Sequence, residues 1–171
     1  MHKRQRGFTI VELLIVIVVI AILAAIIIVA YNGVQNRASD SRRLHDMQEI
    51  QSAIEAYKTT TGTFPPVTPA NQEPLGYEAS FVTGSFLDTL KANGIVKQIP
   101  VDPINNSTYY YRYYVYAAGQ YGCPASRGIY YILEIVKFQS KSGMGQGPGF
   151  SCSGRDWAAQ DAQWATGNYL N

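Results

Sequence analysis

Apolar residues dominate the first part of the chain. They run without a charge from Leu13 to Tyr31, and residues 8–11 extend the run backwards past a single carboxylate, Glu12. About 20 apolar residues are long enough to span a bilayer as a helix. An ionisable group costs roughly 2.5–3.5 kcal/mol near the centre of a membrane, and less near its edge. A chain that keeps Glu12 in this run is therefore expected to use its carboxylate.

The pattern after Val34 becomes that of an amphipathic helix. The predicted apolar face consists of Val34, Ala38, Ser41, Leu44, Met47, Ile50, Ile54 and Tyr57. The predicted solvated face consists of Arg37, Asp40, Arg42, Arg43, Asp46, Glu49 and Glu55. Pro65 and Pro66 exclude a continuation of the helix. We therefore predict one helix from Phe8 to about Thr60, whose second half packs against a globular head.

The rest of the chain predicts a small sheet. Residues 62–108 form a connector rich in Pro, Thr and Asn, with one short helix around residues 86–91. A tyrosine-rich strand is predicted at residues 109–116, and we interpret its tyrosines as core and cross-strand packing. A second strand is predicted at residues 129–138, with one apolar face formed by Ile129, Tyr131, Leu133 and Ile135. The late segment 142–149 is rich in glycine and is predicted to be a loop.

The N-terminal flank carries three basic residues between positions 3 and 6. The apolar run behind it is too long for an ordinary secretory signal, and its small residues lie inside the run. Cysteine is absent near the end of the run, which excludes a lipoprotein anchor. An uncut single-pass anchor is an alternative, although it leaves the placement of Gly7, Phe8 and Glu12 unexplained. The basic residues near the two ends of the run give no clear orientation.

The string Lys-Arg-Gln-Arg-Gly-Phe-Thr-Ile-Val-Glu-Leu-Leu at positions 3–14 resembles the start of type IV prepilins and type II secretion pseudopilins. In that family a prepilin peptidase cuts the leader after the glycine and methylates the new N-terminal amine. The resemblance implies cleavage between Gly7 and Phe8 and N-methylation of Phe8. It also implies an assembly role for Glu12, whose carboxylate would meet the N-terminal amine of a neighbouring subunit. The alternative for Glu12 is a carboxylate that snorkels to the lipid headgroups.

The resemblance further implies an α+β pilin fold, with the long helix packed on a small antiparallel β-sheet. Residues 1–7 would be the leader, residues 8–31 the transmembrane or filament-core segment, and residues 32–171 an extracytoplasmic head. The implied partners are copies of the chain, other pilins, the prepilin peptidase, an inner-membrane assembly platform and membrane lipid. The chain would be a single-pass protein of the cytoplasmic membrane before it enters a filament on the cell surface or in the envelope.

Two segments depart from the family pattern. Many pilins carry a glycine and a proline in the apolar half of the helix, where this chain has Ala21 and Val29. The sequence therefore does not support a melted segment there. Residues 100–103 resemble the Pro-x-Asp-Pro entry to the sheet of major secretion pseudopilins, but Ile104 and Asn105 replace the usual Trp-Gly pair.

Cys123 and Cys152 are the only cysteines. An even count in an exported domain predicts a disulfide between them. The closed loop of about 30 residues would stabilise the head by roughly 3–4 kcal/mol on the loop-entropy model. The alternative is two reduced cysteines in a cytosolic chain, which the N-terminal signal argues against.

Charge and motifs exclude several functions. The chain has 14 Lys and Arg against 12 Asp and Glu, so loss of the three basic leader residues leaves it near neutral, without an electrostatic case for nucleic-acid binding. After the leader only His45 remains, and the Gly-x-Ser-x-Gly motif is missing, so we expect neither an enzyme nor a cofactor. Asp102, Asp156 and Asp161 carry carboxylates of the type that binds calcium, but their spacing matches no oxygen-ligand loop.

These features together favour a structural subunit that polymerises into a type IV pilus or a type II secretion-like pseudopilus. One alternative is a minor, initiating pilin. Another is a membrane-tethered binding module that never polymerises. Glu12 separates the last alternative from the others, because a tether gains nothing from a carboxylate in its apolar segment.

Overall fold

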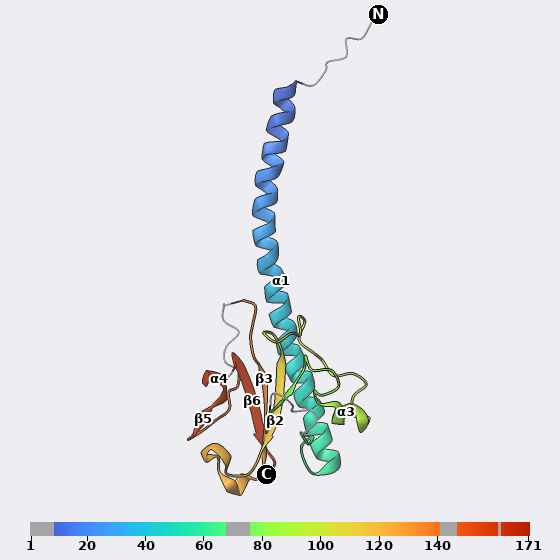
Figure 1. Cartoon of the computed structure of the whole chain (residues 1–171), viewed down its shortest axis with the longest axis vertical. Helices are drawn as coiled ribbons and strands as arrows, with labels where there is room; N and C mark the ends of the chain where they lie inside the picture. Colours follow the sequence, from blue (N-terminus) through green and yellow to red (C-terminus); the bar gives the residue numbers. More distant parts are fainter. Residues whose placement is uncertain (1–8, 68–75, 141–146, 161) are drawn as a thin grey trace, which may run out of the picture. The chain divides into compact units, whose positions relative to one another are not determined.

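A computed structural model of the chain describes residues 9–67, 76–140, 147–160 and 162–171. The chain divides into two compact units, with the boundary between Ala38 and Ser39. Helix α1, Ile10–Thr61, is continuous over 52 residues (Figure 1). The helix continues through positions 21 and 29 without a break, as expected because the chain has neither glycine nor proline there. The predicted helix is thus confirmed over the described residues; Phe8, its expected first residue, lies outside them.

The C-terminal end of α1 follows from its sequence. Gly62 adopts a φ of 77°, and its N–H donates a hydrogen bond of 2.8 Å to the carbonyl of Lys58. Glycine reaches this left-handed conformation without strain, which is why it commonly ends helices. The two prolines at positions 65 and 66 then prevent the chain from resuming a helix.

The head contains a four-stranded antiparallel sheet in the order β1-β2-β3-β6. Figure 1 shows β2, β3 and β6 side by side. Its strands are β1 (Glu78–Ala79), β2 (Tyr111–Tyr116), β3 (Tyr130–Ile135) and β6 (Trp164–Tyr169). A two-stranded ribbon consists of β4 (Ser151–Cys152) and β5 (Arg155–Asp156). The short helices are α3 (Asp88–Ala92), α4 (Trp157–Gln160), η1 (Gln120–Gly122) and η2 (Ala125–Arg127).

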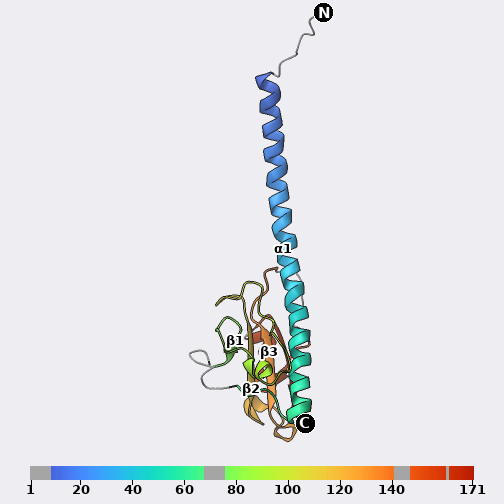
Figure 2. The ribbon, with the colours of Figure 1, turned by 90° about the vertical axis from the view of Figure 1, so that its right-hand side faces the viewer.

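Both faces of the central strand β3 are buried. The part of α1 that belongs to the head runs along one face (Figure 2), and the core between them contains Met47, Ile50, Ile54, Tyr113, Tyr131 and Leu133. The C-terminal segment covers the other face, and the core there contains Tyr130, Ile132, Trp157, Ala165 and Tyr169. All six residues of β3 are therefore buried, whereas the alternating pattern had indicated only one apolar face.

The predicted solvated face of α1 is wrong at three positions. Asp40, Arg43 and Asp46 are 0%, 0% and 5% exposed. The prediction placed them in solvent because burial of an unpaired charge is costly. In the folded head each of them has a charged or hydroxyl partner, which offsets part of that cost.

The predicted apolar face of α1 is correct only in its second half. Met47, Ile50, Ile54 and Tyr57 are buried and Leu44 is half-buried. Val34, Ala38 and Ser41 are exposed.

Two strands and the short helix were anticipated, with small shifts of their ends. The observed β2 and β3 begin at Tyr111 and Tyr130, and α3 spans Asp88–Ala92, where a short helix around residues 86–91 was expected. Of the predicted loop 142–149, residues 147–149 are turn and coil, and residues 142–146 lie outside the described part of the chain. The elements after it, β4, β5, α4 and β6, were not predicted. In β6, a Cβ at Gly167 would lie 2.5 Å from the carbonyl oxygen of Tyr131, so only glycine fits there. Glycine weakens the strand pattern in a sequence, which hid this strand.

Candidate assembly and processing site

Glu12 lies in the first turn of α1 and is bound by Thr9. Its Oε2 accepts hydrogen bonds of 2.8 Å from the backbone N–H and from the hydroxyl of Thr9. In return the N–H of Glu12 donates to Thr9 Oγ1 at 3.3 Å. This reciprocal arrangement is a capping box, which satisfies N–H groups that have no partner inside the helix.

Thr9 was missed as a site residue by the sequence analysis. The signal was present, since Thr-Ile-Val-Glu at positions 9–12 matches the Ser/Thr-x-x-Glu pattern of a capping box. The resemblance to prepilins drew the interpretation of Glu12 towards a neighbouring subunit and away from its own helix.

The second oxygen of Glu12 is not used by the described part of the chain. Both bonds from Thr9 end on Oε2, and among the described residues none donates to Oε1. An ionised carboxylate has about four acceptor positions on its two oxygens. Glu12 can therefore hold the start of its own helix and still accept a donor from outside the chain.

The surface around Glu12 is apolar. The large apolar side chains between Ile10 and Ile27 are 48% to 81% exposed. An exposed apolar surface of this size indicates lipid or other helices as its surroundings. Among the described residues of this unit before position 28, Glu12 is the single ionisable group. Gly7 and Phe8, the predicted cleavage site, lie outside the described residues.

The two cysteines form a disulfide that links distant parts of the head. Cys123 follows η1 and Cys152 lies in β4, and their Cα atoms are 5.0 Å apart. The N–H of Gly154 donates to the carbonyl of Tyr121 at 3.0 Å, next to the disulfide. These bonds attach the β4–β5 ribbon to the connection between β2 and β3.

A buried ion network lies around Arg43. Its guanidinium makes two hydrogen bonds to Asp102, of 2.6 and 2.9 Å, and one of 2.6 Å to Asp40. Asp102 also accepts the N–H of Ile104 at 2.8 Å. Asp40 Oδ2 accepts the N–H and the hydroxyl of Ser140, both at 2.7 Å. Arg43 thus joins α1 to the loop before β2 and to the segment after β3.

The carboxyl group of Asp40 is held in its ionised form. Burial by itself would raise its pKa, but hydrogen bonds from Gln139, Ser140 and Arg43 outweigh burial and lower the pKa. The same donors keep Asp40 anionic at neutral pH, as a permanent partner for the guanidinium.

The three aspartates considered for calcium have other surroundings. Asp102 is paired with Arg43, and Asp156 accepts the N–H of Ala159 at 3.1 Å. Asp161 lies outside the described residues. Within the described ranges there is no group of three His, Cys, Asp or Glu side chains that could hold a metal ion.

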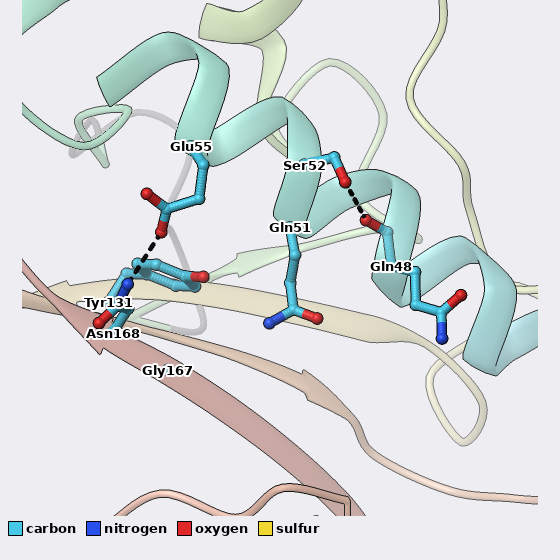
Figure 3. A pocket seen from close by; sticks show the side chains of 7 residues that line it. All are labelled: Gln48, Gln51, Ser52, Glu55, Tyr131, Gly167 and Asn168. Atoms are coloured by element: carbon cyan, nitrogen blue, oxygen red, sulfur yellow. Dashed lines mark hydrogen bonds between the residues drawn. The ribbon is translucent and has the colours of Figure 1, made fainter. Parts of the chain in front are cut away.

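A groove of about 500 Å³ lies between α1 and β6 (Figure 3). It is lined by Gln48, Gln51, Ser52, Glu55, Tyr131, Gly167 and Asn168. Glu55 accepts a hydrogen bond from Asn168 at 3.1 Å, and Ser52 donates to the carbonyl of Gln48 at 2.8 Å. The bond between Glu55 and Asn168 thus connects the helix to the edge of the sheet, whereas that of Ser52 stays within the helix backbone.

Comparison with known proteins agrees with this arrangement. Residues 2–28 match the family model described as the prokaryotic N-terminal methylation motif. The type II secretion system core protein G of Escherichia coli (strain K12) is 31% identical over 107 residues, which cover 60% of this chain and 69% of that protein. No solved structure gives a significant match.

The methylation motif coincides with the start of α1. In the described part of the chain, α1 is the one helix that is long and apolar enough to cross a membrane. The motif and this helix together indicate the inner-membrane anchoring that is typical of pilins. Membership of the family also implies processing by a prepilin peptidase and assembly into a filament. The chain belongs to the pilin and pseudopilin family, whose members are structural proteins rather than enzymes.

Proposed function

We propose that this chain is a subunit that polymerises into a type IV pilus or a type II secretion-like pseudopilus. Cleavage between Gly7 and Phe8 and N-methylation of Phe8 precede assembly. Residues 8–31 move from the membrane into the filament core, and the head, residues 32–171, lies outside the cytoplasm. The observation that carries the proposal is the free oxygen of Glu12 on an exposed apolar helix surface.

The partner of Glu12 in this proposal is the N-terminal amine of Phe8 in a neighbouring subunit. Two unit charges at 4 Å attract with about 4 kcal/mol at an effective dielectric constant of 20, compared with about 1 kcal/mol in water. A carboxylate left without a cation in apolar surroundings is strongly unfavourable. The position at which a neighbour supplies its amine is therefore preferred over other positions along the helix.

Thr9 positions the carboxylate in this proposal. Its two hydrogen bonds hold Oε2, which leaves Oε1 for the incoming amine. Docking then does not require the capping box to open. Thr9 acts through Glu12, and its own contacts with the neighbour are not needed.

The alternatives differ in how they use these residues. A non-polymerising tether gains nothing from Glu12, whereas a minor, initiating pilin needs the same carboxylate. The similarity to a protein named as a core protein of the type II secretion system favours a pseudopilus over a pilus. The other partners of the proposal are further pilins, the prepilin peptidase, an inner-membrane assembly platform and membrane lipid.

The test is assembly of Glu12 variants in cells that make filaments. Glu12→Gln and Glu12→Val should be cleaved and methylated normally, since the leader and Phe8 are unchanged, but should enter sheared filaments poorly even beside wild-type chain. Glu49→Gln, which removes an exposed carboxylate from the head, is the matched control and should assemble normally. Entry of Glu12→Val at the wild-type rate would contradict the docking role.

A further inference from the structure

A small pocket lined by aromatic residues lies on the head, separate from the assembly site. Its volume is about 170 Å³, and it is lined by Gly76, Tyr77, Tyr114, Tyr116, Gln120 and Tyr121. Tyr114 and Tyr116 are two residues apart on β2, so their side chains leave the same face of the strand. Tyr116 packs against the core on the face away from α1.

Three tyrosine rings form a continuous wall of this pocket. The ring centroids of Tyr114 and Tyr116 are 4.5 Å apart, and those of Tyr116 and Tyr121 are 5.5 Å apart in an edge-to-face arrangement. Tyr121 is 39% exposed, although it is a large aromatic residue. The pocket thus offers apolar ring surface to a ligand from solvent.

The pocket also has polar groups that are available to a ligand. Among the described residues, the hydroxyls of Tyr114 and Tyr121 and the amide nitrogen of Gln120 have no hydrogen-bond partner. The amide oxygen of Gln120 accepts the N–H of Ala117 at 3.2 Å, which orients the amide. Specific ligand pockets combine apolar walls with a few placed polar groups in this way.

The charges near the pocket argue against an organic cation. The guanidinium of Arg155 lies 4.9 Å from the ring centroid of Tyr121, and that of Arg112 lies 5.3 Å from the ring of Tyr77. Two fixed positive charges this close to the pocket repel a further cation, which disfavours a quaternary ammonium group. Among the described residues, the lining contains no carboxylate to attract a basic ligand. An acyl chain is also disfavoured, because it would bury the free hydroxyls without partners.

Tyr121 is kept in the pocket at a conformational cost. Its φ is 53°, in the left-handed region, which costs roughly 1–2 kcal/mol for a residue with a side chain. Glycine would adopt this conformation freely. Strain of this kind is often found at functional sites, and here it places the ring of Tyr121 across from Tyr116.

We propose that this pocket binds one neutral pyranose ring. Such a ring has C–H groups on its faces, which match the tyrosine rings, and hydroxyls on its edge, which match Gln120 and the free tyrosine hydroxyls. The ligand is uncharged, in agreement with a lining whose described residues include no carboxylate and with the guanidinium groups that lie close to two of its rings. This pocket shares no residue with the Glu12 site.

The test uses the full chain in a detergent without a sugar headgroup. Methyl glycosides of glucose, galactose and N-acetylglucosamine are titrated, and saturation-transfer NMR and calorimetry report binding. At least one should bind saturably, and Tyr114→Ala and Tyr121→Ala should raise its Kd about tenfold or more, the equivalent of about 1.4 kcal/mol. Tyr109→Phe, a half-buried tyrosine outside the pocket, is the control and should leave Kd unchanged.

A second variant separates binding from folding. Tyr121→Gly removes the ring but also relieves the left-handed strain, so the head should fold and form its disulfide while sugar binding is lost. The proposal is overturned if none of the three glycosides binds the wild-type chain. It is equally overturned if Tyr121→Gly binds them as well as wild type, or if choline binds more tightly than every glycoside.

Discussion

Replacing Asp102 tests the buried network directly. Asp102→Asn keeps the shape of the side chain but removes the charge that faces the guanidinium of Arg43. Both side chains of the pair are 0% exposed. Removal of one partner from a buried ion pair costs about 3–5 kcal/mol, because the other charge remains buried without compensation. Asp40 still pairs with Arg43 at 2.6 Å, so we expect the low end, about 3 kcal/mol.

A surface pair provides the comparison for this loss. Lys91 and Asp88 are 3.2 Å apart, with side chains 49% and 36% exposed. Pairs of this kind contribute about 0–1 kcal/mol, so Asp88→Asn should change the stability by less than about 1 kcal/mol. The two substitutions make the same chemical change, and only burial distinguishes them.

The assay is urea unfolding of the full chain in detergent, followed by tryptophan fluorescence. Trp157 and Trp164 are both buried in the head, so the signal reports the unit that contains the network. The double substitution of Asp102→Leu with Arg43→Met removes both charges of the pair. Its loss of unfolding free energy should be about 1–3 kcal/mol smaller than the sum of the losses for Asp102→Leu alone and Arg43→Met alone. A loss for Asp102→Asn no larger than that for Asp88→Asn would show that the pair is solvated, and would refute the reasoning.

Three further predictions concern the rest of the chain. Thr9→Ala removes the capping box and should weaken the helix start by about 1 kcal/mol and reduce filament assembly, whereas Thr9→Ser should assemble normally. Reduction of the disulfide, whose cysteines are 29 residues apart, should lower the free energy of unfolding by about 3–4 kcal/mol in urea titrations, and thiol labelling before reduction should find no free cysteine. Burial raises the pKa of Asp46 above 3.8, and the hydroxyl of Tyr111 opposes this effect only in part, so Asp46→Asn should raise the melting temperature at pH 7. Because the folded head binds this proton more tightly than the unfolded chain, that gain should disappear below about pH 3.8, and a gain that persists there would contradict it.

The parts of the fold that the sequence predicted are those with a strong local pattern. The apolar run, the prolines after Gly62 and the tyrosine-rich strand each indicate one element without reference to distant residues. The end of α1 and the strands β2 and β3 therefore lie close to where they were expected. Cys123 and Cys152 were paired because no other partner exists in the sequence.

The parts that were missed depend on contacts between distant segments. Arg43 and Asp102 are 59 residues apart, and neither position has a local signal for burial. Strand β6 is recognisable only beside β3, where its glycine fits against the backbone of Tyr131. Thr9 had a local signal, but the interpretation of Glu12 as an intermolecular residue concealed it. The aromatic pocket requires the loop at Tyr121 to be placed against β2, which no sequence pattern indicates.

The most direct test of the central claim is the N-terminal mass of the chain in sheared filaments. Filaments are collected from cells with an active prepilin peptidase and assembly platform, and the N-terminal peptide is identified by mass spectrometry. The account predicts that the chain is present in this fraction and begins at N-methylated Phe8. A chain that remains in the membrane fraction with Met1 or Lys3 at its N-terminus would contradict the account.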